Sequence, residues 1–164
     1  MSVKLTYATS LTVDETLETN VPAANWQKKT VRHDGWNTAE TLTDVTPVPV
    51  SLHAAFVATI AGGIYVLDLT ALPGTNGVAV DGTGKKVQAV KFKAPAANVG
   101  PVAFAMGAVN GFPIVNGGSD FGLLPGQELV FFGNEKSEEV SPTMRLVDVT
   151  GNSGDMVYVQ VVIG

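Results

Sequence analysis

Branched aliphatic residues recur at every second position over residues 156–163. Four branched aliphatic residues share one side of this pattern, namely Val157, Val159, Val161 and Ile163. A shift of one residue would move all of them into water, so the pattern predicts a strand with one buried face and a fixed register. Residues 90–93 follow the same rule, because Val90 and Phe92 alternate with two lysines.

The spacing of glycine and proline extends this pattern to an all-β chain. Valine and threonine, whose branched Cβ favours strands, are frequent, and 18 glycines and 9 prolines interrupt the sequence at short intervals. We expect nine short strands, at residues 4–13, 28–33, 48–60, 64–70, 87–93, 102–106, 128–132, 143–149 and 156–163. The segment 48–60 is long enough to bend across two sheets.

Residues 14–27 differ in composition from the predicted strands around them. They begin with acidic residues and end around a proline, so we expect an extended arm and not a packed element. This divides the chain into an N-terminal strand and arm, residues 1–27, and a β-sandwich domain, residues 28–164. The first strand is then free to dock on a neighbouring copy, with domain exchange as one form of docking.

Composition narrows the classes of function. Only 15% of the 164 residues are charged, which favours a protein that hides part of its surface in an assembly. The net charge of −5 argues against a direct contact with nucleic acid, which needs a basic face. The sequence has no cysteine, which excludes disulfides and thiolate metal sites. We find no secretory leader and no apolar run long enough for a membrane span, so we expect a soluble protein made in the cytoplasm.

Four lysines lie close together in the sequence: Lys85, Lys86, Lys91 and Lys93. Two interpretations are open. The lysines can pair with an acidic partner, or they can protect the exposed side of a strand against edge-to-edge association. We treat all four as interface candidates.

Two short motifs resemble catalytic loops. Asp120-Phe121-Gly122 matches the magnesium-binding triplet of protein kinases, but the partner lysine, catalytic loop and glycine-rich lid of a kinase are missing. The segment 82–86 resembles the end of a P-loop, but Ala79 replaces its first glycine and Lys86 replaces its Ser or Thr. We therefore expect no enzyme, no catalytic residues and no cofactor.

Two aromatic and two imidazole side chains keep alternatives open. Trp26 and Trp36 flank the second predicted strand, where they either anchor an interface or stack on a glycan. His33 and His53 are the two histidines, and with Asp34 they can supply ligands to a metal centre in a β-barrel enzyme. Ordinary surface and strand positions are the simpler interpretation of both histidines.

The segment 129–132, with the sequence LVFF, is apolar on both faces. This predicts a strand buried between the core and something else, such as a neighbouring subunit, and it makes Phe131 an interface candidate. The preceding Pro125-Gly126 suits the central positions of a type II turn. Asn116-Gly117-Gly118 tolerates positive φ and predicts a tight reversal.

Four stretches resemble the small β-rich structural proteins of tailed-bacteriophage virions. In that group a lysine-bearing strand is followed by an Asn-rich corner, a glycine-rich segment and a Pro-Gly corner, and the chain closes with a Thr-Gly strand pair. The carrying stretches are LDLTALPGTNGVAVDGTGKKVQAVKF (67–92), PAANVGPVAFAMGAVNGF (95–112), LLPGQELVFF (123–132) and LVDVTGNSGDMVYVQVVIG (146–164).

The resemblance implies a non-enzymatic virion component, a capsid decoration or cement protein located on the capsid surface. It further implies a jelly-roll or sandwich fold, a homotrimer, and the major capsid protein as partner. The alternative is a carbohydrate- or receptor-binding β-sandwich module, which serves as a head or tail accessory or in cell-surface adhesion. In that case Trp26 and Trp36 are the stacking residues.

Overall fold

A computed structural model describes residues 3–9, 13–17, 29–33, 38–47, 49–74, 77–115, 120–132 and 137–164, and the side chains of these residues outside 9–38. This part of the chain contains twelve strands and no helix, which confirms the all-β prediction. It accordingly holds no helix suited to crossing a membrane. Contacts divide the chain into two units, which are Leu5–Thr41 and the combination of Met1–Lys4 with Leu42–Gly164.

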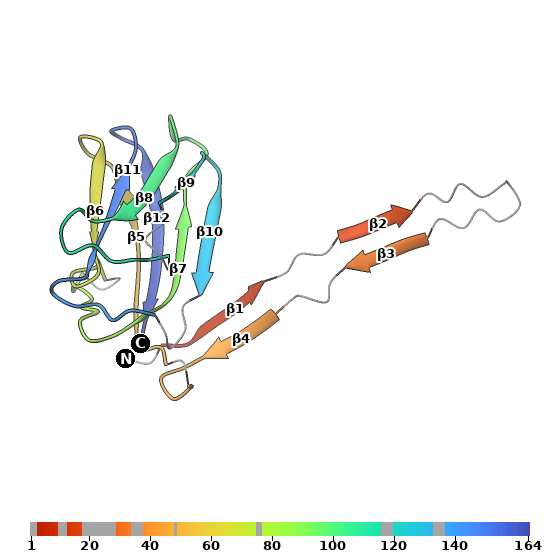
Figure 1. Ribbon diagram of the computed structural model, residues 1–164, viewed down its shortest axis with the longest axis horizontal. Coiled ribbons are helices and arrows are strands. Elements are labelled where there is room, and N and C mark those ends of the chain that lie inside the picture. Colours follow the sequence, from red (N-terminus) through yellow and green to blue (C-terminus); the bar gives the residue numbers. More distant parts are fainter. Residues whose placement is uncertain are drawn as a thin grey trace, which may run out of the picture. The chain divides into compact units, whose positions relative to one another are not determined.

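The larger unit is a sandwich of two four-stranded sheets (Figure 1). Its strands are β5 (Leu52–Thr59), β6 (Ile64–Asp68), β7 (Val87–Lys93), β8 (Val102–Met106), β9 (Phe121–Leu123), β10 (Glu128–Phe132), β11 (Leu146–Thr150) and β12 (Met156–Ile163). One sheet has the order β10-β7-β12-β5, and the other has the order β6-β11-β8-β9.

Strand pairing in the sandwich is nested along the chain. β5 pairs with β12, β6 with β11, β7 with β10 and β8 with β9, and every pair is antiparallel. A long hairpin folded over onto itself gives this order, and the additional pairs β7–β12 and β8–β11 complete the two sheets. This is the jelly-roll topology, so the predicted jelly-roll-like β-sandwich is confirmed.

The core lies between the two sheets, and β12 shows how the sequence pattern creates it. Its four predicted inward residues are all buried, with exposed fractions of 2% or less. Tyr158 points to the other side of the sheet and is 45% exposed. The predicted register of this strand is therefore correct.

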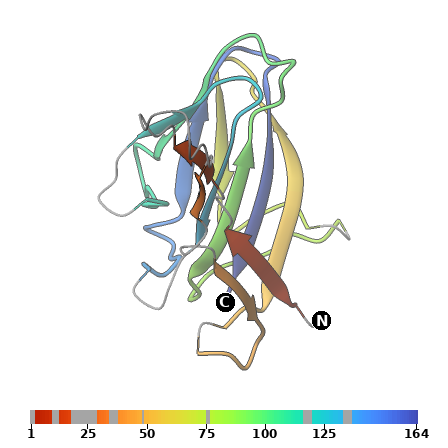
Figure 2. The same cartoon turned by 90° about the vertical axis from the view of Figure 1, so that its right-hand side faces the viewer.

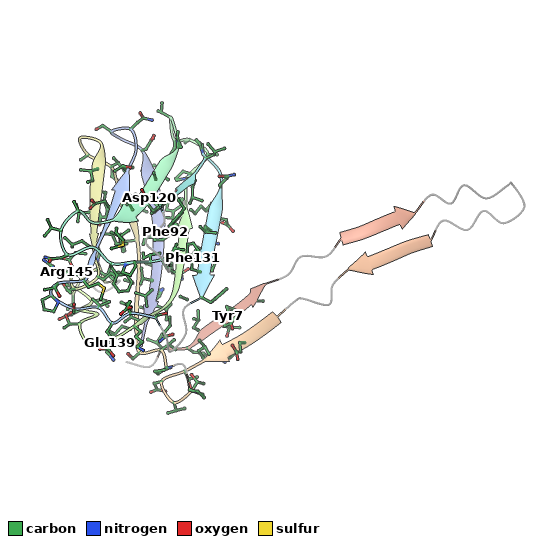
Figure 3. All side chains as sticks on the ribbon, in the orientation of Figure 1. Tyr7, Phe92, Asp120, Phe131, Glu139 and Arg145 are labelled. Carbon is green, nitrogen blue, oxygen red and sulfur yellow. The ribbon has the colours of Figure 1, made fainter. Side chains whose placement is uncertain are left out.

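Four phenylalanine rings form a row between the sheets. Phe92 on β7 lies 4.4 Å from Phe104 on β8, and Phe104 stacks on Phe121 of β9 at 4.7 Å, measured between ring centroids. Phe131 on β10 makes an edge contact with Phe121 at 5.4 Å. Figure 3 labels Phe92 and Phe131, which belong to one sheet, whereas the two central rings belong to the other. The row therefore ties the two sheets together, and such pairs add about 0.5–1.5 kcal/mol each beyond their burial.

A two-glycine turn connects the sheets between β5 and β6. Gly62 and Gly63 both have positive φ, at 62° and 92°, as in a type I′ turn. Ala61 and Ile64 exchange backbone hydrogen bonds across this turn, each at 3.4 Å. Side chains with a Cβ rarely adopt two such conformations in succession, which explains the pair of glycines.

A buried polar clasp joins the β7–β8 loop to the β11–β12 loop. Asp155 is 3% exposed, and its carboxylate accepts the Val99 N–H at 2.7 Å and the Asn152 side-chain amide at 3.2 Å. Asn98 donates to the Met156 carbonyl at 2.8 Å and accepts the Met156 N–H at 2.9 Å. The hydrogen bond from Val99 is the main reason that the pKa of Asp155 lies below its usual range.

Some predicted strand boundaries are wrong. The strand predicted at 48–60 spans only Leu52–Thr59 and stays in one sheet, so it does not bend across two. The chain joins the sheet only after Val50, because the Val50 N–H donates to the Thr43 carbonyl at 2.9 Å and the Ser51 N–H is the first to donate to β12, at the Ile163 carbonyl. The strand β9 was not predicted, because three residues are too few to show an alternation.

The smaller unit is a β-ribbon, a name we use for residues 5–41. In it β1 (Leu5–Thr9) pairs with β4 (Thr38–Leu42), and β2 (Val13–Leu17) pairs antiparallel with β3 (Lys29–His33). The sequence placed 28–33 in the sandwich domain and 14–27 in an extended arm. The structure divides the chain after Thr41 instead of after residue 27, because β3 pairs with β2 and with no strand of either sheet.

Candidate functional site

Two of the lysines singled out from the sequence lie on the outer face of the sheet β10-β7-β12-β5, which we call the lysine face. Figure 2 shows three strands of this sheet, β5, β12 and β7, side by side. The register places Tyr158 of β12 between Val57 of β5 and Lys93 of β7. The lysine face comprises Ala55, Val57, Lys91, Lys93, Glu128, Val130, Tyr158 and Gln160.

A single carboxylate neutralises part of the charge of this face. Glu128 Oε1 lies 3.2 Å from Lys91 Nζ, and Glu128 Oε2 lies 3.8 Å from Lys93 Nζ. The three side chains are 40–47% exposed, so each pair contributes only about 0–1 kcal/mol to stability. These contacts set the charge of the face and contribute little to holding the fold together.

The other two lysines lie where β7 enters the sheet. Lys85 Nζ donates to Ser51 Oγ at 3.0 Å. The backbone of Lys86 exchanges two hydrogen bonds with Gly164, each at 3.0 Å. The sequence cluster is thus divided in space, and Lys91 and Lys93 are its members on the lysine face.

Phe131, a predicted interface residue, turns toward the core. Its ring contacts Phe121 and lines a cavity of about 140 Å³, together with Val87, Val90 and Phe112. Drug-sized ligands need pockets of about 300–1,000 Å³, so this cavity does not indicate a substrate site. The neighbouring Val130 points outward and is 41% exposed. The strand therefore has one core face and one partly open face, and it is not buried on both sides within a single chain.

The imidazole and indole candidates are separated or undescribed. His53 Nε2 lies 3.2 Å from Gln160 Nε2, on the outer side of the sheet. Trp26 and Trp36 lie outside the described residues, as does the side chain of His33. Across the described ranges, no group of three His, Asp or Glu side chains is placed to hold a metal ion.

The two motifs that resemble catalytic loops, at 120–122 and 82–86, have structural roles. Phe121 belongs to the aromatic row, and its neighbour Asp120 is exposed. In the P-loop-like segment, Asp81 accepts the Thr83 hydroxyl at 2.6 Å and the Thr83 N–H at 2.9 Å. These hydrogen bonds, led by the hydroxyl, lower the pKa of Asp81. The segment is a turn stabilised by a side chain, with Gly84 at a φ of 73°.

The predicted Pro-Gly corner is confirmed. Gly126 has a φ of 88°, and the Gln127 N–H donates to the Leu124 carbonyl at 2.9 Å, as a type II turn requires. The predicted reversal at Asn116-Gly117-Gly118 lies outside the described residues.

Sequence reasoning missed the apolar part of the lysine face. Val57 is 50% exposed and Tyr158 is 45% exposed. They border a shallow depression of about 420 Å³, together with Lys91 and Lys93. The alternation over 156–163 places Tyr158 opposite the core, but Val57 sits in the run HAAFVAT, which shows no alternation. An aromatic and aliphatic centre beside two cations suits a protein contact better than a small-molecule site.

Comparison with known proteins adds little to this description. No family model matches the sequence, and no curated protein matches it. A structural search finds the solution NMR structure of a de novo designed double-stranded β-helix, which is 15% identical over 70% of this chain and 100% of that chain, with a TM-score of 0.32. The jelly-roll assignment rests on the strand order of this chain and not on that likeness.

Proposed function

We propose that the protein is a non-enzymatic structural component of a tailed-bacteriophage particle, which decorates and stabilises the capsid surface as a homo-oligomer. The observation that carries the proposal is that one chain contains a β-ribbon in addition to a complete jelly roll. All eight strands of the jelly roll lie in residues 52–163, so the ribbon is not needed to complete either sheet.

The ribbon needs a surface to pack on. A two-stranded antiparallel ribbon is only marginally stable in water, because it has no third strand and no second layer. Its described side chains at Thr6, Ala8 and Ala39 to Thr41 are exposed. A capsid subunit or another copy of the chain can supply the missing cover, and binding then stabilises the ribbon while it anchors the jelly roll.

Binding to an assembled shell also explains how such a protein stabilises a particle. A protein that binds the closed shell and not its free subunits shifts the equilibrium toward the shell by mass action. Several copies joined in one oligomer multiply weak contacts into a strong attachment. The low charge content and the phage-like stretches of the sequence support this role, and the major capsid protein is the expected partner.

Electron microscopy of purified virions tests the proposal most directly. We expect the chain on the outer surface of the head, and heads that lack it should lose their contents at lower temperature. A variant without residues 5–41 should no longer sediment with heads, whereas Val66→Lys, on the other sheet, should still do so. Absence of the chain from the head would overturn the proposal. Glycan binding that is lost in Trp36→Ala would instead support the carbohydrate-binding alternative.

A further inference from the structure

We infer that β5 pairs edge to edge with β5 of a second copy of the chain, so that the sheet β10-β7-β12-β5 continues across a two-fold axis. The inference rests on the sandwich alone and is independent of the proposed function. Figure 2 shows β5 at the rim of its sheet, beside β12.

Of the four edge strands in the sandwich, β5 is the least protected. Edge strands usually avoid association by being short, by carrying charges or proline, or by containing a bulge. β9 has three residues, β6 ends in Asp68, which is paired with Arg145, and β10 begins with Glu128. β5 has eight residues, LHAAFVAT, without a formal charge, a glycine or a proline.

Half of the β5 backbone groups point away from β12. The Ile60 N–H donates to the Asp155 carbonyl at 2.9 Å, which fixes the phase of the alternating hydrogen-bonded pairs. The N–H and C=O groups of four residues therefore point to the open side, namely His53, Ala55, Val57 and Thr59. No described strand pairs with this side. It forms a ready template for another strand.

The sequence of β5 is complementary to itself in an antiparallel pair. With Phe56 opposite Phe56 of the second copy, Ala55 faces Val57 and His53 faces Thr59, and the open backbone groups meet each other. No like charges lie opposite one another in this register. Like charges at such positions would destabilise the pair. The exposed Val57 also packs against small neighbours across the two-fold axis.

This pairing predicts a closed dimer. The same strand contributes from both copies, so the contact is isologous and cannot continue into a ring of three. A trimer, which the phage-like stretches imply, requires two different surfaces on each copy. The mass of the purified chain in solution therefore separates the two arrangements without any capsid present.

Sedimentation of the purified full-length chain over a wide concentration range is the first test. We expect twice the mass of the 17.0 kDa chain. Val57→Lys should halve that mass, because lysine on an edge strand opposes edge-to-edge pairing and the two added ammonium groups would lie on the same face close to the two-fold axis. Val66→Lys is the matched control, since Val66 is 46% exposed on the edge strand β6 and should leave the dimer intact. Circular dichroism would show that both variants keep the fold.

Disulfide trapping tests the register. The natural chain has no cysteine, so single-cysteine variants report on one position each. Oxidising a mixture of Ala55→Cys and Val57→Cys chains should give a cross-linked dimer, because opposite Cα atoms in such pairs lie about 5.5 Å apart, within the range of a disulfide. A mixture with Val66→Cys in place of Val57→Cys should not cross-link. A mass of one or three chains for the natural protein, or a dimer that Val57→Lys leaves unchanged, would overturn the inference.

Discussion

Asp155 shows how one residue can hold two loops together. Its carboxylate is buried and receives backbone and side-chain hydrogen bonds from both sides of the clasp. These donors favour the charged form, so protonation weakens the clasp. Stability contributed by such a group is complete above its unfolded pKa of about 3.9 and is lost as the pH falls toward the lower folded pKa.

We therefore expect the natural protein to lose stability as the pH falls below about 4, and Asp155→Asn to lose less over the same interval. The variant should be the less stable of the two at neutral pH, because the amide is a weaker acceptor. Urea unfolding between neutral and acidic pH measures both effects. Asp44→Asn, at an exposed turn position, serves as control. Parallel pH profiles for the natural protein and Asp155→Asn would contradict the assignment.

Phe104 is the central ring of the core. Its side chain is 1% exposed, and its ring contacts Phe92 on β7 of the facing sheet and Phe121 on the adjacent strand β9. Phe104→Ala should lower the free energy of unfolding by about 3–5 kcal/mol, because the cavity lies between two sheets that cannot close over it. Val66→Ala, at an exposed position, should cost less than about 1 kcal/mol. Chemical denaturation measures both; equal costs would show that the row is not the mechanical link between the sheets.

At the scale of elements, a strand can be predicted from the sequence when apolar residues recur at every second position. The inward and outward faces of β12 were predicted correctly, because one side of the strand is aliphatic throughout. β4, with the sequence TAETL, was missed because it has no apolar face to reveal a period. The lysines of β7 were correctly placed opposite the core, but their division from Lys85 and Lys86 depends on tertiary contacts. The exposure of Val57 likewise follows from its place on an edge strand, which no local pattern encodes.

The ion pairs of the lysine face allow a prediction about charge. Glu128→Gln should change the free energy of unfolding by less than about 1 kcal/mol, because both pairs are exposed and screened by salt. Thermal unfolding at low and high salt measures this. The same variant removes one negative charge from a chain of net charge −5, so its retention on an anion-exchange column at neutral pH should fall. A large loss of stability would show that these contacts are structural.

At the scale of the whole molecule, the chain consists of two units with different requirements. The sandwich has its own core, whereas the ribbon has only paired strands. We expect residues 42–164 to fold alone and to unfold in one cooperative transition, since all strands of both sheets are included. Circular dichroism and heat denaturation of this fragment check the prediction. An unfolded fragment would show that residues within 1–41 are needed for the sandwich to fold.

The nested strand order also governs how the chain is made. The ribosome synthesises β5 first among the sandwich strands, yet its partner β12 is made last. β12 lies between β7 and β5, so that sheet has no continuous hydrogen bonding until the final strand has left the exit tunnel. Pairing between such distant segments is slow, and strands that wait for a partner are prone to aggregate. The nascent chain therefore completes this sheet only after residue 163 has left the tunnel, and a chaperone that shields β5 and β7 during that interval should raise the yield of folded protein.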